Sequence, residues 1–307
     1  MPREVEPSQN EKQFFTKALE EEIRLDGRGF DDFRPLSLDF GEEYGVADVR
    51  LGKTRVLTHI TAEVTSPFPD RPFDGLFTIT TELSPMTSPS FEVNRPTETE
   101  LLLSRLLEKT LRRSSAIDTE SLCLIAGQKV WSIRADVHIL SHDGNLIDAS
   151  CIAIIAALQH FRKPDTSTEG ESVTVYTLAE REPVPLSLLH HPLCITFSFY
   201  KPTPSASSAD EENEELTLID ATHLEEQLRH GSVTISMNRH GEICQIAKLG
   251  GMAIDAVTLL HCTNVALVKV KELSKFITRR LDEHKKSKDE GGLIAELLSS
   301  ENSRIPG

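Results

Sequence analysis

The chain has 307 residues, of which 38% are hydrophobic and 26% charged, and this composition is typical of a globular protein with a sizeable core. Its formal net charge of −15 argues against broad, non-specific affinity for nucleic acid, but it is compatible with a local basic patch. No apolar stretch approaches the roughly 20 residues needed to span a bilayer, so we expect no membrane association. The opening segment MPREVEPSQNEKQFF has no apolar core of a secretory leader, and we expect no secretion.

Five cysteines are dispersed along the chain, and no two of them form a C-x-x-C pair. This pattern predicts mostly buried, free thiols in a reducing compartment, and it does not predict a zinc site. The five are Cys123, Cys151, Cys194, Cys244 and Cys262.

The first part of the chain predicts a helix followed by strands. Residues 7–23 have the apolar spacing of an amphipathic helix, and the turn-rich segment RLDGRGFDDFRP follows. The stretches PLSLDF, GVADVRLG and TRVLTHITAEV predict three strands, with Gly52-Lys53 as a hairpin turn between the last two. A proline-rich loop then leads to a further strand in LFTITTELSPM. The apolar face of the first helix is expected to contain Phe14, Phe15, Ala18, Leu19 and Ile23.

The clearest helix is PTETELLLSRLLEKTLRRSSAID, in which Thr97 and Glu100 have the spacing of a capping box. A long strand, KVWSIRADVHILSHDG, comes next. The segment after it, DASCIAIIAALQHF, is apolar on almost all sides. A helix with that pattern has no polar face for water, so we expect it to be buried.

The composition changes near residue 164, at KPDTSTEGESV, which indicates a boundary. The second unit has predicted strands near 172–179 and 193–200, a hairpin turned by MNRHGE, and a helix of about 30 residues from Ala253. Both units contain strands, a glycine-bearing turn and a long helix, which predicts an α+β fold of two similar halves packed as one body. The expected domains are a helical extension at 1–25, halves at 26–165 and 172–284 with an acidic linker at 201–215, and a flexible charged tail at 285–307.

Asp143 and Asp148 flank a glycine turn in SHDGNLIDASCIA. In a structural interpretation, Asp143-Gly144 makes a tight turn and Asp148 caps a helix that begins near Ala149. The other interpretation is a calcium loop, but an EF-hand needs oxygen ligands at alternate positions and a glutamate at the twelfth. That position, counted from Asp143, holds Ile154, so the sequence favours a joint between a strand and a helix.

Asp220 and Glu226 form a second carboxylate pair, in LIDATHLEEQL. Such a pair can position a metal or a proton if it faces a basic groove, and the alternative is a solvated segment at the start of a helix. The eleven histidines show no H-E-x-x-H or similar ligand spacing, and His190-His191 is expected to be structural. No G-x-S-x-G, Walker or G-x-G-x-x-G motif occurs, which excludes the common hydrolase and nucleotide-binding templates.

Arg105, Lys109 and Arg112 recur at helical spacing on the polar side of the clearest helix, with Arg113 beside them. Cations on one rigid face can neutralise several phosphates at once, which makes this face the candidate nucleic-acid site. The alternative is a solvated face whose cations pair with Glu100 or Glu108.

Several segments together resemble the RNase PH-like ring subunits of the eukaryotic RNA exosome. They are RLDGRGFDDFRPLSLDFG, DRPFDGLFTITTELSPM, REPVPLSLLHHPL and the stretch from RLLEKTLRRSSAID to DGNLIDASCIAIIAAL. The resemblance implies the RNase PH fold, with two β-α-β-α halves, and a six-membered ring of related subunits. It also implies OB-fold cap subunits, RNA threaded through the ring, exosome-associated ribonucleases as partners, and a location in the nucleus, nucleolus and cytoplasm.

Catalytic members of that family carry G-G-T-R after the aspartate of the glycine turn, and the arginine grips the attacking phosphate. Aligning DGNLIDAS with DGGTRTAA places Ile147 at the arginine position. Isoleucine cannot hold an anion, and phosphorolysis needs a bound, charge-neutralised phosphate. Asp220 and Glu226 keep the six-residue spacing of the family's catalytic carboxylates, and the resemblance implies that they are a degenerate remnant.

The expected function is therefore a noncatalytic structural subunit of the core ring, which supports 3′→5′ RNA processing and degradation (rRNA maturation, RNA surveillance and mRNA turnover). We expect no cofactor and no bound metal. An active phosphate-dependent 3′→5′ exoribonuclease is the alternative, and Ile147 is the feature against it. A scaffold unrelated to RNA is a third interpretation, which would require the basic helix face to be buried in ion pairs. The residues expected to reach the RNA path are Arg105, Lys109, Arg112 and Arg113.

Overall fold

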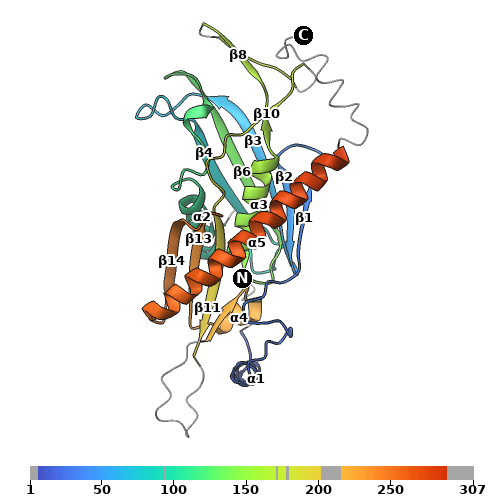
Figure 1. Cartoon of the computed structure of the whole chain (residues 1–307), viewed down its shortest axis with the longest axis vertical. Helices are drawn as coiled ribbons and strands as arrows, with labels where there is room; N and C mark the ends of the chain where they lie inside the picture. The colour runs from blue at the N-terminus through green and yellow to red at the C-terminus, as the bar shows by residue number, and fades with distance from the viewer. Residues whose placement is uncertain (1–5, 93–94, 171, 178–179, 202–215, 289–307) are drawn as a thin grey trace.

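The computed structural model describes residues 6–92, 95–170, 172–177, 180–201 and 216–288, and it contains two main sheets (Figure 1). The first sheet has the order β1-β2-β3-β6-β4, with β5 paired to β6. Its strands pair antiparallel, except that β4 and β6 run parallel. The strands are β1 (Leu36–Phe40), β2 (Val46–Leu51), β3 (Thr54–Thr65), β4 (Leu76–Leu83), β5 (Cys123–Ile125) and β6 (Lys129–Ser141).

The second sheet is antiparallel and has the order β12-β11-β13-β14. Two short pairs, β7 with β10 and β8 with β9, lie between the two main sheets in the chain. The remaining strands are β7 (Arg162–Lys163), β8 (Thr166–Glu169), β9 (Ser172–Val175), β10 (Val184–Pro185), β11 (Leu193–Tyr200), β12 (Leu216–Ile219), β13 (Gly231–Met237) and β14 (Ile243–Gly251). The helices are α1 (Gln9–Glu20), α2 (Glu98–Leu111), the 3₁₀ turn η1 (Glu120–Leu122), α3 (Leu146–His160), α4 (His223–Leu228) and α5 (Ala256–Lys288).

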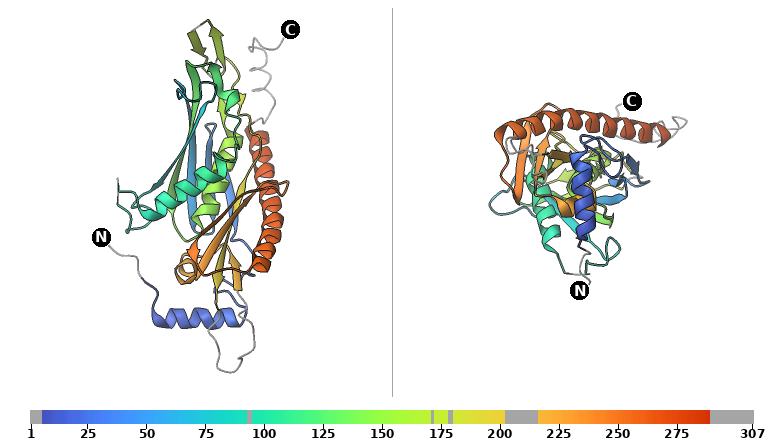
Figure 2. Two further views of the ribbon diagram at one scale, coloured as in Figure 1. Left: turned by 90° about the vertical axis from the view of Figure 1, so that its left-hand side faces the viewer. Right: turned by 90° about the horizontal axis from the view of Figure 1, so that it is seen from below.

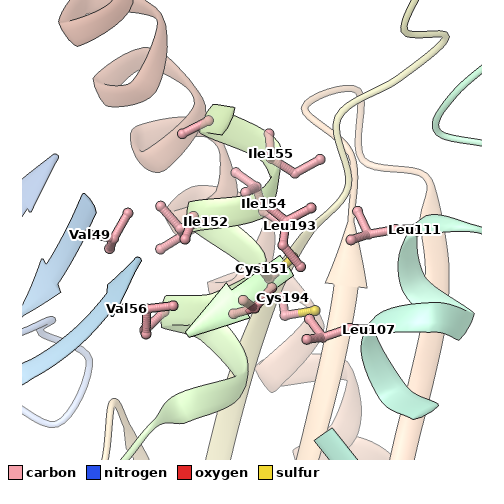
Figure 3. Packing of buried hydrophobic residues seen from close by; sticks show 14 of the residues in the cluster. Val49, Val56, Leu107, Leu111, Cys151, Ile152, Ile154, Ile155, Leu193 and Cys194 are labelled. Carbon is pink, nitrogen blue, oxygen red and sulfur yellow. The ribbon is translucent and has the colours of Figure 1, made fainter. Parts of the chain in front are cut away.

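Helix α3 is the core that both halves share. It packs on β2 and β3 of the first sheet and on β11 of the second, and almost all its residues are buried. Figure 3 shows Ile152 of α3 facing Val49 and Val56, while Cys151 and Ile154 lie toward Leu193. A helix that is apolar all round can be stable only when surrounded, so the prediction of a buried helix here is confirmed.

Helix α5 extends alongside both halves (Figure 2). It packs on β11 and β13 of the second sheet and on β1 of the first. Near its end, Arg280 donates from Nε and Nη2 to the main-chain oxygen of Leu38 in β1, at 3.0 and 2.9 Å. The helix continues to Lys288, so the predicted tail at 285–307 begins inside it; the rest of that tail lies outside the described residues, as does the linker at 202–215.

Helix α1 docks on the edge of the second sheet through part of its predicted apolar face. Phe15 and Leu19 are buried, and the Phe15 ring meets the Tyr200 ring edge-on at 5.3 Å. Phe14 and Ile23 are 65% and 54% exposed, so their assignment to the buried face is wrong. The helix ends at Glu20, before Ile23, and Phe14 lies about 100° around the helix from Phe15.

The structure also contains the predicted hairpin turn and the predicted cap of the clearest helix. The hairpin turn at Gly52 is confirmed, with φ of 59° between β2 and β3. Thr97 caps α2 by accepting from the Glu100 N–H at 3.4 Å. All five cysteines are thiols, and three are buried. In the part of the chain that the structure describes, no helix has the length and apolar character needed to cross a bilayer.

Candidate functional site

The loop between β6 and α3 lies where the two halves meet. Gly144 has φ of 86°, and a Cβ on it would come within 2.4 Å of the Ala221 main-chain oxygen, so the close approach requires glycine. The main-chain oxygen of Asp143 accepts from the His223 N–H at 3.1 Å, and that of Gly144 accepts from the Thr54 hydroxyl at 2.7 Å. The predicted turn at Asp143-Gly144 is confirmed, and it also fastens the first half to the second.

Asp148 does not cap α3, and that prediction is wrong. The helix begins at Leu146, earlier than the predicted start near Ala149, so Asp148 lies inside the first turn. Its fully buried carboxylate instead accepts from the Thr196 N–H at 2.9 Å and the Thr196 hydroxyl at 2.8 Å. Burial raises the pKa of Asp148 to about 7, against the opposing effect of these hydrogen bonds. Asp148 therefore connects α3 to β11.

Asp220 follows β12, is fully buried, and is held by three side chains. Arg34 donates from Nε to Oδ2 at 2.9 Å, from Nη2 to Oδ1 at 2.7 Å, and from its main-chain N–H to Oδ2 at 2.7 Å. Arg28 Nη1 lies 3.1 Å from Oδ2, and Asn145 Nδ2 donates to Oδ1 at 2.8 Å. We call these four residues the arginine clamp.

The clamp decides the charge state of Asp220. Burial acts to raise the pKa of this carboxyl, but the hydrogen bonds and the charge of Arg34 outweigh it, and the pKa lies below its ordinary value. The carboxylate is therefore ionised and paired inside the protein. The interpretation of this segment as solvated is wrong for Asp220.

A second buried ion pair lies beside the clamp. Arg24 Nη2 is 2.7 Å from Glu225 Oε2, and the two side chains are 0% and 1% exposed. Arg24 also donates to the main-chain oxygens of Ile219 and Asp220, at 3.0 Å each. Glu225 closes a capping box with Thr222 at the start of α4. Sequence reasoning does not find these pairs, because the arginines of RLDGRGFDDFRP have no local pattern that identifies their distant partners.

Glu226 lies next to Glu225 in α4 and belongs to a group with two histidines. Its Oε1 accepts from the Asn145 N–H at 3.0 Å, and burial raises the pKa of its carboxyl. The rings of His142 and His223 meet edge to face, with centroids 4.8 Å apart. Burial, together with the charges of His223 and Arg34, lowers the pKa of His142 to about 4. One potential ligand atom from each of His142, His223 and Glu226 lies within 4.8 Å of the other two.

The sequence does not predict this group, because no histidine of the chain has the spacing of a metal-ligand motif. His142 follows β6, whereas His223 begins α4, and the fold alone brings these distant segments together. His223 and Glu226 are three positions apart on one helix, a local signal that sequence reasoning missed. His190, in contrast, is structural as expected, because its Nε2 lies 2.7 Å from the Ser114 main-chain oxygen.

Asp220 and Glu226 are thus brought together around Asn145, but they differ in what they can do chemically. Both oxygens of Asp220 carry hydrogen bonds from the clamp, whereas Glu226 accepts through Oε1. Ile147 lies in the first turn of α3, two residues after Asn145, and packs against the core. Its hydrocarbon side chain offers an anion neither charge nor a hydrogen-bond donor.

The predicted RNA-binding residues lie on a separate element, at the C-terminal part of α2 and just after it. Arg105 and Arg112 both pair with Glu108, at 3.0 and 2.8 Å, but their side chains stay 74% and 52% exposed. Lys109 and Arg113 are exposed too, and the described residues provide no ion pair for either. The basic face is therefore open to a ligand. The scaffold interpretation requires this face to be buried in ion pairs, and it is not.

The contact region between the two halves, formed by the loop before α3, the arginine clamp and α4, is here called the seam. The fold and this seam define a class of protein. Residues 32–164 match the model of domain 1 of the 3′ exoribonuclease family, and residues 192–269 match its domain 2. The chain belongs to the 3′ exoribonuclease family, and the predicted RNase PH fold and α+β class are confirmed.

Two fungal proteins and one solved structure are similar to this chain over most of its length. The chain is 50% identical to Exosome complex component rrp45 of Schizosaccharomyces pombe over 289 residues, which are 94% of this chain and 96% of the relative. It is 44% identical to Exosome complex component RRP45 of Saccharomyces cerevisiae over 306 residues, 99% of each chain. Among solved structures, it resembles a chain of the Archaeoglobus fulgidus exosome with RNA bound to the active site. That match has a TM-score of 0.72 and 27% identity, and covers 86% of this chain and 96% of the other.

Proposed function

We propose that this chain is a noncatalytic structural subunit of the exosome core ring that supports 3′→5′ RNA processing and degradation. The observation that carries the proposal is the similarity to two proteins named as exosome complex components over nearly their full length. In a six-membered ring, its direct neighbours are other RNase PH-like subunits.

The arginine clamp supports the absence of catalysis. A carboxylate that serves a metal or a proton in a reaction needs an oxygen free to do so. Arg34 contacts both oxygens of Asp220, and the position expected to grip phosphate is Ile147. Both features oppose catalysis, because Ile147 provides no anion site and Arg34 occupies the carboxylate of Asp220.

Phosphorolysis tests this directly. The tag-free chain, incubated with a single-stranded RNA in phosphate buffer with Mg²⁺, is expected to release no nucleoside diphosphates. The Ile147→Arg variant should be inactive as well, because Asp220 stays held by Arg34. Phosphate-dependent release of nucleoside diphosphates by the folded chain would establish the alternative, an active exoribonuclease.

We also propose that the exposed basic face of α2 contacts RNA in the assembled ring. Replacing Lys109, Arg112 and Arg113 by alanine should weaken binding and flatten its salt dependence. If each contacts one phosphate of single-stranded RNA, the log–log slope falls by about 2, at roughly 0.7 per contact.

The matched control removes three exposed cations from α5: Lys271, Lys275 and Arg279. The control ring should keep its affinity and slope, and both rings should assemble. Unchanged RNA binding by the α2 variant contradicts the contact, and loss of the ring would make these residues part of a subunit interface.

Assembly is supported by the second sheet. Its edge strand β14 exposes Ile243, Ile246 and Leu249 by 46%, 46% and 51%, and unpaired edges with apolar side chains favour a neighbour. We expect the chain to be stabilised by an RNase PH-like partner in size-exclusion runs, and a stable monomer that ignores such partners would contradict this. We further propose that the chain assembles with OB-fold cap subunits and exosome-associated ribonucleases. We also propose that it is located in the nucleus, nucleolus and cytoplasm.

A further inference from the structure

The group of His142, His223 and Glu226 at the seam has the composition of a metal site. His142 comes from the end of β6 in the first half, and His223 and Glu226 come from α4 in the second. The three potential ligand atoms lie within 4.8 Å of one another. Two imidazoles and one carboxylate form a ligand set that Zn²⁺ commonly takes, with water in the fourth position.

Each ligand has an atom that can bind a metal. The buried Nδ1 of His223 has no hydrogen-bond partner among the described residues. Its Nε2 lies 3.0 Å from the nitrogen of the Gln227 side-chain amide. If that amide is flipped, its oxygen accepts a hydrogen bond from a protonated Nε2, and the unprotonated Nδ1 keeps a free lone pair. Such an outer hydrogen bond is how ligating histidines are usually oriented.

The other two ligands are also accessible. Oε1 of Glu226 accepts from the Asn145 N–H and lies 3.6 Å from Arg229 Nη1, whereas Oε2 has no hydrogen bond within the described part of the chain and is the oxygen open to a metal. His142 accepts one long hydrogen bond, from the Gly144 N–H to Nδ1 at 3.2 Å, which a metal–nitrogen bond can replace. All three side chains are partly exposed, so the group lies near the protein surface.

The fit requires only small side-chain movements. With metal–ligand bonds of about 2.0–2.2 Å, the ligand atoms of a tetrahedral site are roughly 3.4 Å apart. The most distant pair must therefore approach by up to about 1.4 Å from the 4.8 Å limit, within the reach of χ rotations. Arg34 does not block the site, because Asp220 and the main-chain oxygens of Asp143 and Gly144 hold its guanidinium.

We propose that His142, His223 and Glu226 bind one divalent transition-metal ion, best matched by Zn²⁺, which links β6 to α4 across the two halves. This site differs from a carboxylate pair that holds Mg²⁺. Asp220 is engaged in the arginine clamp, and nitrogen ligands select zinc-like ions over magnesium. The proposal does not depend on the function proposed above.

The test measures metal binding to the tag-free chain in a Cys123→Ser/Cys244→Ser background, which removes the two partly exposed thiols. After chelation and dialysis, calorimetry with Zn²⁺ should show one ion per chain, and the ion should raise the Tm by several degrees. A large excess of Mg²⁺ should not displace it. Co²⁺ should give the visible bands of a four-coordinate nitrogen and oxygen site.

Variants assign the ligands. His142→Ala, His223→Gln and Glu226→Gln should each weaken Zn²⁺ binding at least tenfold and remove the Tm rise, while the circular dichroism spectrum stays unchanged. His138→Ala, which removes a histidine paired with Glu82 on the open face of the first sheet, is the matched control and should bind as the parent does.

His223→Gln changes a partly exposed residue of α4 and decides the question if His142→Ala fails to fold. The proposal is overturned if the parent chain binds no Zn²⁺ below about 100 µM, a Kd corresponding to roughly −5.5 kcal/mol. It is also overturned if the three variants bind Zn²⁺ as the parent does, or if Co²⁺ shows sulfur charge-transfer bands.

Discussion

The arginine clamp predicts a large loss of stability when one of its charges is removed. Asp220→Asn keeps the shape of the side chain and suits the left-handed backbone at this position, where φ is 50°. It leaves the guanidinium of Arg34, which is 5% exposed, with the Asp143 carboxylate at 3.5 Å as its remaining anionic partner. Removing one partner of a buried pair costs about 3–5 kcal/mol, and we expect about 3 because the new amide still accepts a hydrogen bond.

A double-mutant cycle separates this pair from its surroundings. Arg34→Met should cost a similar amount, and the double variant should lose at least about 1.5 kcal/mol less than the sum, since the second change removes the group that the first left unpaired. Urea unfolding followed through Trp131, the chain's one tryptophan, gives the free energies. Arg279→Met breaks an exposed pair with Glu283 and should cost less than about 0.5 kcal/mol. Losses that add within about 0.5 kcal/mol would refute the coupling.

Two further predictions concern α3 and the loop before it. Because burial raises the pKa of Asp148 from 3.8 to about 7, the folded state binds one more proton than the unfolded state between these values. The free energy of unfolding should therefore fall by up to ~1.4 kcal/mol per pH unit as the pH rises through this window. Asp148→Asn should remove that slope in urea titrations at stepped pH, and an unchanged slope would assign the proton to another group. Gly144→Ala should lower the Tm more than Gly127→Ala, because a Cβ at 144 would lie 2.4 Å from the Ala221 oxygen whereas at 127 the nearest atom is 3.9 Å away. Equal losses would contradict the close approach at the seam.

The local parts of this fold could be predicted because each has a pattern within a short window. The alternating stretches became β2 and β3, the apolar segment became the buried helix α3, and the turn MNRHGE lies between β13 and β14. The same reasoning located the glycine turn before α3, since Gly144 has a positive φ. It misplaced the start of α3, because Asn145 and Asp148 are both residue types that favour the N-cap position. Asn145 occupies that position although its side chain bonds Asp220, and Asp148 bonds Thr196 instead.

The seam could not be predicted in the same way, because its contacts join residues far apart in the chain. Arg34 and Asp220 are separated by 186 positions, and Arg24 and Glu225 by 201. A carboxylate pair with catalytic spacing looks the same in a sequence whether solvent, a metal or an arginine faces it. The side chains that contact it from other segments decide its chemistry, so the clamp and the histidine group are visible only in the folded chain.

The contacts between the two halves also give these acidic residues a role in folding. Two halves that meet through the loop before α3 and through α4 must bury polar main-chain groups there, and each needs a partner. Arg24 and Arg34 supply donors to the main-chain oxygens of Ile219, Asp143 and Gly144, and Asp220 and Glu225 neutralise these two arginines. Losing either carboxylate would leave a buried cation, so folding alone is a sufficient physical reason for both to be present. Glu226 is contacted by Asn145 and Arg229 through Oε1 alone and lies beside two histidines, so it is the carboxylate that remains available to a ligand.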